Sequence, residues 1–139
     1  MRLNIGVIGV GHLGKYHLEK LISRDDINFV GFFEQDIARR KFICKEFDVT
    51  AFNKIEELLK KCDAVSIATP TIYHYEVAKK AMELGCHVFI EKPITHTLEE
   101  AESLLHQAEE LNKFIQVGHI EQFNPALTAI NFDDVNPMF

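Results

Sequence analysis

The stretch that decides the fold is IGVIGVGHLG, residues 5–14, in which glycine recurs at positions 9, 11 and 14. This GxGxxG pattern gains weight here because it lies between a strand-like apolar run and a helix-like segment. Gly9 would permit a tight turn, Gly11 would let backbone approach a pyrophosphate, and Gly14 would let the helix pack closely against the strand. The N-terminus of that helix would offer free N–H groups to an anion. The stretch therefore predicts a strand–loop–helix unit that binds a dinucleotide.

An acidic residue supports the same interpretation. Glu34 ends the next apolar run, about 20 residues after the loop, where an acid is expected to hold the ribose hydroxyls and repel a 2′-phosphate. We therefore expect NAD, with NADP the less favoured cofactor. Arg39 and Arg40 could reach a 2′-phosphate, but we interpret both as solvated charges on the following helix. A tight turn without a ligand and an S-adenosylmethionine site remain alternatives, whereas the absence of a lysine–serine pair excludes a Walker-type triphosphate site.

Strand-like and helix-like segments alternate along the whole chain. A capping box, Thr97 with Glu100, marks the start of the last long helix. Such alternation predicts an α/β fold of Rossmann type, a doubly wound parallel sheet of about six strands covered by helices on both faces. The predicted strands are 3–8, 29–33, 50–52, 64–68, 87–90 and 114–118, and the predicted helices are 13–23, 37–47, 55–60, 73–84 and 98–111.

Composition limits the class of protein. The 139 residues are the size of one domain, and the net charge of −6 argues against nucleic acid and anionic membrane as partners. No apolar run approaches the roughly 20 residues needed to span a bilayer, and the N-terminus does not resemble a signal peptide. The three cysteines are widely spaced and form no CxxC pair, so we expect no metal site and a reducing, cytoplasmic location.

Polar residues follow three of the predicted strands. The sequence ATPT at 68–71 leads to His74, the fifth strand is followed by Glu91-Lys92-Pro93, and the sixth by Gly118-His119. Because the carboxyl ends of parallel strands meet at one edge of a sheet, we expect these residues beside the glycine loop. Pro93 restricts Lys92 to extended geometry, and a lysine near a cofactor ring could share a proton with a substrate hydroxyl. The alternative for Lys92 is a solvated loop charge.

Four motifs resemble those of the Gfo/Idh/MocA family, and the resemblance extends from about Leu3 to the C-terminus. They are GVGHLG (9–14), ATPTIYH (68–74), HVFIEKP (87–93) and VGHIEQFNP (117–125). The resemblance implies an NAD(P)-binding Rossmann domain followed by a larger α/β domain. It also implies an NAD(P)-dependent dehydrogenase that transfers a hydride between a sugar, nucleotide-sugar or polyol hydroxyl and the nicotinamide. The last motif is also similar to members that act on nucleotide sugars at the 3-position.

The resemblance also assigns roles to residues. It makes Lys92 the catalytic lysine and Pro93 a proline often found cis, and it places Glu91, Thr69, Pro70 and His74 along the nicotinamide ribose. Gln122 departs from the arginine of many relatives, which puts a contact with an anionic substrate in doubt. The full set predicted to bind the cofactor is Gly9, Gly11, His12, Leu13, Gly14, Glu34, Ala68, Thr69, Pro70, His74, Glu91, Lys92, Pro93 and His119.

These expectations divide the chain in two. Residues 1–123 would form the cofactor domain, and residues 124–139 would begin the connection to a C-terminal substrate domain that this chain lacks. The piece alone would then be inactive, and exposed apolar residues such as Phe132 and Phe139 would promote self-association. We expect a homo-oligomer with a small-molecule substrate. The alternative function is a stand-alone NAD-binding or redox-sensing module without catalysis.

Overall fold

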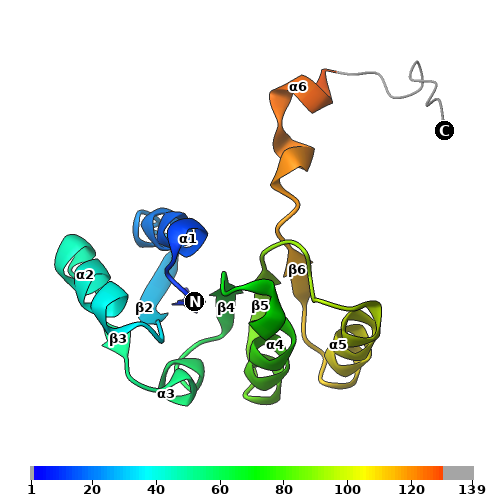
Figure 1. The fold of residues 1–139 in the computed structure, drawn as a ribbon, viewed down its shortest axis with the longest axis horizontal. Helices are drawn as coiled ribbons and strands as arrows, with labels where there is room; N and C mark the ends of the chain where they lie inside the picture. Colours follow the sequence, from blue (N-terminus) through cyan, green and yellow to red (C-terminus); the bar gives the residue numbers. More distant parts are fainter. Residues whose placement is uncertain (1, 130–139) are drawn as a thin grey trace.

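The computed structural model describes residues 2–129, which form a single parallel sheet with helices between the strands (Figure 1). The strand order is β3-β2-β1-β4-β5-β6, and every pair of neighbours is parallel. This is the strand order of a Rossmann fold, so the predicted fold class and six strands are confirmed. The elements are β1 (Leu3–Ile8), α1 (His12–Ile22), β2 (Ile27–Phe33), α2 (Ile37–Phe47), β3 (Ala51–Phe52), α3 (Ile55–Leu59), β4 (Ala64–Ile67), η1 (Thr71–Tyr73), α4 (His74–Glu83), β5 (His87–Ile90), α5 (Leu98–Glu110), β6 (Ile115–Val117), η2 (Ile120–Phe123) and α6 (Pro125–Thr128).

The helices form two layers on opposite faces of the sheet. Figure 1 shows α1 and α2 on one face and α3, α4 and α5 on the other. Successive side chains of β1 point to opposite faces of the sheet, so this strand contributes to both hydrophobic cores. Val7 packs in the cluster under α1 and α2, and Ile8 packs in the larger cluster under α3 to α5. Leu18 and Met82 are examples of the buried helix residues that complete these clusters. The sheet is thus held from both sides at its centre.

Coverage of the sheet is unequal. On the α1 side, no helix among residues 2–129 lies over β4, β5 and β6, and an open, mainly apolar hollow of about 770 Å³ lies there instead. The expectation of full burial on both faces therefore fails for this part of the sheet. Phe114, just before β6, and Phe123, in η2 after it, are 75% and 76% exposed, which fits the prediction of exposed apolar surface. The residues predicted to carry it, Phe132 and Phe139, lie outside the described range.

Two local predictions near the last strand can also be compared with the structure. The short helical turn expected after Asn124 is present as α6, with the Asn124 side chain accepting a hydrogen bond from the Ala126 N–H over 3.0 Å. Residues 130–139, most of the predicted connection to a second domain, lie outside the described range.

Within residues 2–129, no helix is long and apolar enough to cross a membrane, and no group of acidic, histidine and cysteine side chains is placed to hold a metal.

Candidate functional site

The glycine loop has the close packing that its sequence requires. Gly9 adopts a φ of +82°, a conformation that favours glycine, and its N–H donates to the Phe33 carbonyl oxygen over 2.9 Å. A Cβ placed on Gly14 would lie 1.9 Å from the carbonyl oxygen of Gly9, so only glycine lets α1 approach the loop this closely. A Cβ on Gly11 would meet no atom within 4 Å. The third loop glycine in sequence is therefore needed for packing, and the second faces open space.

Glu34 binds the loop directly. One carboxylate oxygen, Oε2, accepts a hydrogen bond from the Val10 N–H over 2.9 Å, and Oε1 accepts one from the Asp36 N–H over 3.0 Å. The acid therefore connects the end of β2 to the turn before α1. A carboxylate held in this way has a defined position beside the loop and still has lone pairs for ligand hydroxyl groups.

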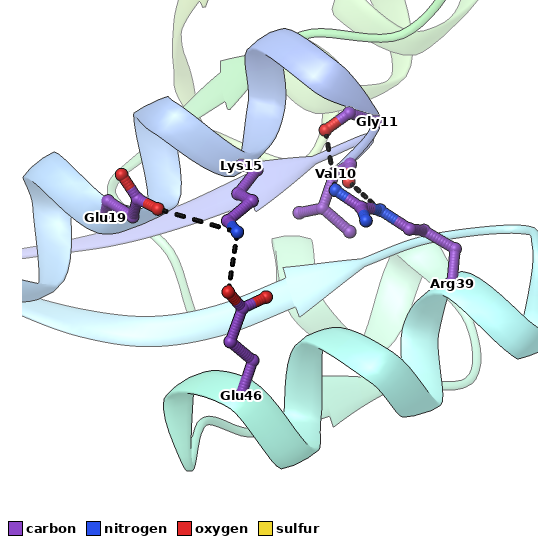
Figure 2. A network of polar contacts seen from close by, with 6 residues as sticks. All are labelled: Val10, Gly11, Lys15, Glu19, Arg39 and Glu46. Atoms are coloured by element: carbon purple, nitrogen blue, oxygen red, sulfur yellow. Dashed lines mark hydrogen bonds and ion pairs between the residues drawn. The ribbon is translucent and has the colours of Figure 1, made fainter.

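Arg39 is not the solvated charge that the sequence suggested. Its Nε donates to the Val10 carbonyl oxygen over 2.7 Å and its Nη2 to the Gly11 carbonyl oxygen over 3.1 Å, as Figure 2 shows. Arg40 is likewise engaged, because its Nη1 donates to Asn53 Oδ1 over 2.8 Å. The prediction for these two arginines was wrong because the start of α2 lies close to the glycine loop on one side and to the end of β3 on the other, contacts that sequence spacing does not reveal.

An ion pair also connects α1 and α2, further from the glycine loop. Lys15 of α1 forms an ion pair with Glu46 of α2 at 2.6 Å and a longer one with Glu19 at 3.9 Å (Figure 2). Both contacts are partly exposed, so each contributes little to stability. The Lys15–Glu46 pair links α2 to α1, and Arg39 links α2 to the loop.

A pocket of about 550 Å³ opens at the carboxyl ends of β1, β2 and β4. Six of the predicted site residues line it: Gly9, Gly11, Glu34, Ala68, Thr69 and Pro70. Seven further residues line the pocket and were not predicted from the sequence: Ile8, Phe33, Gln35, Asp36, Ile55, Tyr73 and Val77. Gln35 and Asp36 could have been found, because they directly follow the predicted ribose acid. The apolar ones carry no signal that separates a pocket wall from the core.

His74 lies below this pocket rather than in its lining. It is 1% exposed, with Nδ1 2.9 Å from the Pro93 carbonyl oxygen and Nε2 2.9 Å from the Thr69 carbonyl oxygen. Its ring thus connects the ends of β4 and β5. The predicted contact between His74 and a ribose is not favoured by this arrangement, since both ring nitrogens already face backbone.

Glu91 and Lys92 of the EKP segment, residues 91–93, have different surroundings. Glu91 is 7% exposed and points to the α1 side of the sheet, where it contacts His17, so it does not line the pocket. Lys92 is exposed, and its side chain has no hydrogen bond or ion pair with any of residues 2–129. The Lys92–Pro93 peptide bond is cis, as the resemblance predicted.

The remaining predicted residues lie around the pocket without lining it. They are His12, Leu13, Gly14, Pro93 and His119, and all except Gly14 are exposed. His12 stacks edge-on against Tyr16 at the start of α1. Lys92 and His119 come after strands that pair in parallel, Ile90 opposite Val117, so they share one edge of the sheet with the loop. The structure therefore gathers the predicted residues at one edge, but only six of them in one pocket.

The pocket has features that fit a nucleotide. The Thr69 hydroxyl is buried and has no hydrogen-bond partner among the described residues, so a ligand could satisfy it. The first turn of α1 has no side-chain cap, which leaves backbone N–H groups for an anion in the open space before Gly11. An acid, an unpartnered hydroxyl and an uncapped helix are the groups that ribose and pyrophosphate need.

Comparison with known proteins identifies the family. Residues 3–119 match the Gfo/Idh/MocA model, described as an oxidoreductase family with an NAD-binding Rossmann fold. The chain belongs to this family. The resemblance is thereby confirmed over residues 3–119, which contain the first three motifs and the start of the fourth.

Two curated Gfo/Idh/MocA relatives illustrate the range of similarity. UDP-N-acetylglucosamine 3-dehydrogenase of Acidithiobacillus ferrooxidans is 39% identical over 127 residues, which are 91% of this chain and 40% of that protein. The scyllo-inositol 2-dehydrogenase (NAD(+)) of Bacillus subtilis is 32% identical over 129 residues, covering 90% of this chain and 38% of that protein. The chain thus spans about 40% of the length of these relatives.

Two solved structures have a fold similar to that of this chain. The crystal structure of the A. ferrooxidans enzyme matches 92% of this chain and 42% of its own with a TM-score of 0.85. A scyllo-inositol dehydrogenase from Lactobacillus casei, with bound NAD(H) and scyllo-inositol, matches 92% of this chain and 39% of its own with a TM-score of 0.83 and 26% identity. The Gfo/Idh/MocA fold of this chain is therefore supported by sequence and by structure.

Proposed function

We propose that this chain is the cofactor domain of an NAD-dependent dehydrogenase that oxidises a sugar, nucleotide-sugar or polyol hydroxyl. The observation that carries the proposal is the meeting of the glycine loop, the Glu34 carboxylate and the unpartnered Thr69 hydroxyl in one pocket. A bound nicotinamide cofactor would supply the hydride acceptor. The protein's own residues would bind and orient the cofactor, and Lys92 would exchange a proton with the substrate hydroxyl.

The adenosine half would lie in the 550 Å³ pocket. The backbone at Gly9 and Gly11 and the uncapped start of α1 would receive the pyrophosphate, and Glu34 would accept hydrogen bonds from the ribose hydroxyls. Two observations favour NAD over NADP. Glu34 would repel a 2′-phosphate, and the guanidinium groups of Arg39 and Arg40 are already held by protein oxygens.

Lys92 would act at the other end of the cofactor. A hydroxyl carbon that gives up a hydride must also release the hydroxyl proton, and a lysine in its neutral form can accept that proton. The side chain follows the end of β5, at the edge where the nicotinamide half would extend, and it has no competing partner among residues 2–129. Pro93 and the His74 contact to its carbonyl oxygen support the backbone beneath it.

The substrate side would come from outside the described residues. We assign residues 1–123 to the cofactor domain and the segment from 124 onward to a connection with a substrate domain, because the relatives are more than twice as long as this chain. The relatives' names point to nucleotide sugars and inositols as substrate classes. A cytoplasmic homo-oligomer fits such an enzyme.

The test separates binding from chemistry. We expect the chain to bind NADH more tightly than NADPH by at least about tenfold, measured by calorimetry. In the complete gene product, Lys92→Met should abolish oxidation of UDP-N-acetylglucosamine or scyllo-inositol while NADH affinity falls by no more than about tenfold. Lys41→Met, an exposed lysine of α2, is the matched control and should keep full activity.

Two results would contradict the proposal. Failure of the chain to bind NADH or NADPH at millimolar concentration would remove the cofactor role. Undiminished turnover by Lys92→Met would remove the role of the lysine.

A further inference from the structure

Three polar side chains from three separate elements meet on the α1 side of the sheet. His17 of α1 lies with Nδ1 2.7 Å from Ser66 Oγ of β4 and with Nε2 2.9 Å from Glu91 Oε1, just after β5. Ser66 and Glu91 are both 7% exposed. The contacts join residues 49 and 74 positions apart in the sequence. None of the three side chains lines the nucleotide pocket.

The chemistry of the groups fixes the direction of the hydrogen bonds. A carboxylate only accepts, so Nε2 of His17 carries a proton and donates to Glu91. In the neutral ring Nδ1 is then an acceptor, and the Ser66 hydroxyl can donate to it. One neutral tautomer therefore satisfies all three side chains. The other oxygen of Glu91, Oε2, accepts from the backbone N–H of Lys92 over 3.2 Å.

Packing holds the Glu91 carboxylate in this orientation. A Cβ on Gly118 would lie 3.2 Å from Glu91 Oε1, so the neighbouring strand end leaves room for the carboxylate and little else. The ring of Phe89 contacts the His17 ring edge-on, with centroids 5.6 Å apart. A carboxylate this buried needs partners, because an unpaired buried charge is costly. His17 is the partner that comes from a different layer of the fold.

We propose that His17 is a positioning residue that couples the cofactor's phosphate site to Lys92. The helix that carries His17 begins at the glycine loop, so the element that would receive the pyrophosphate also holds Glu91, which holds the Lys92 amide. This inference rests on the proposed function, because the dinucleotide and the role of Lys92 belong to it. Without His17, Glu91 loses its side-chain partner and the Lys92–Pro93 segment loses its support on this face.

The test compares two ligands. In the proposed binding mode NADH contacts both the glycine loop and the end of β5 beside Lys92. ADP-ribose lacks the nicotinamide and contacts only the loop. We expect His17→Ala to weaken NADH by about tenfold, because the Lys92–Pro93 segment would no longer be held where the nicotinamide half would lie, and to change ADP-ribose affinity by no more than about twofold. Calorimetry on the 139-residue chain measures both affinities, and thermal unfolding checks that each variant is folded.

Two amide variants sharpen the comparison. In His17→Gln the amide nitrogen can reach the position of Nε2 and donate to Glu91, so NADH affinity should return to within about threefold of the original. His17→Asn is one methylene shorter, cannot reach Glu91, and should behave like His17→Ala, which keeps the test decisive should the alanine variant fail to fold. His106→Ala, which removes an exposed His–Glu pair on α5, is the control and should change neither affinity.

Each outcome of these binding measurements supports or overturns the role of His17. Equal losses of NADH and ADP-ribose in His17→Ala would show that His17 only supports the loop, and would overturn the inference. Equal NADH affinities in the Gln and Asn variants would overturn it as well. If the unaltered chain bound neither ligand, the proposed function itself would fall, and this inference with it.

Discussion

Replacing Gly14 by alanine tests the closest contact in the glycine loop. The new Cβ would lie 1.9 Å from the carbonyl oxygen of Gly9, and real Cβ atoms essentially never come closer than 3.0 Å, so α1 would have to move away by about 1 Å. Overpacking of this kind costs up to about 3 kcal/mol, and the better helix propensity of alanine returns about 1 kcal/mol. We expect a net loss of about 2 kcal/mol, which lowers Tm by about 7 °C for a domain of this size.

Gly11→Ala is the matched variant. Its Cβ meets no atom within 4 Å, so the free energy of unfolding should fall by less than about 1 kcal/mol. The methyl group would instead stand where the pyrophosphate approaches the backbone, and the loss of at least one charge-assisted hydrogen bond predicts NADH binding weaker by tenfold or more, on the order of 2 kcal/mol.

Thermal unfolding with and without NADH measures both effects, since a ligand that binds only the folded chain raises Tm. A Gly14→Ala chain as stable as the original would refute the packing argument. A Gly11→Ala chain that binds NADH normally would refute the placement of the pyrophosphate.

Three further predictions concern selectivity, the cysteines and α5. Glu34→Ala should raise the affinity ratio of NADPH to NADH by about tenfold in competitive calorimetry, and an unchanged ratio would contradict the role of the acid. Burial raises the pKa of the Cys62 thiol to about 12 and that of Cys86 to about 11. Because an unfolded thiol titrates near pH 8.5, the unfolded chain binds fewer protons above that pH, so urea unfolding should show stability falling between about pH 8.5 and 12; a flat profile would count against burial. Thr97→Ala removes the hydroxyl that accepts from the Glu100 N–H over 3.2 Å and should cost about 1 kcal/mol without changing NADH affinity.

Local signals in the sequence predicted the elements well. The capping box at Thr97 and Glu100 forms as expected, and α4 ends before Gly85, whose φ is +94°. Helix α2 and strand β5 have the predicted bounds. These features depend on residues within a few positions of one another, which is why one sequence is enough to find them.

Contacts between distant elements could not be predicted in the same way. Arg39 reaches the loop only because α2 packs beside α1, and the bond from His17 to Glu91 spans 74 positions. His74 was assigned to the nicotinamide ribose because of its motif, whereas in the structure both of its ring nitrogens face backbone carbonyl oxygens. Exposed apolar surface was predicted, but its location on β4, β5 and β6 was not, because apolar strands indicate burial without saying what covers them.

A crystal structure of the chain with bound NADH tests the central claim most directly. The account predicts the pyrophosphate against the backbone of the glycine loop, ribose oxygens within hydrogen-bond distance of Glu34, and the nicotinamide at the strand edge beside Lys92. A ligand bound in the hollow on the α1 side, or a nicotinamide directed away from Lys92, would contradict it.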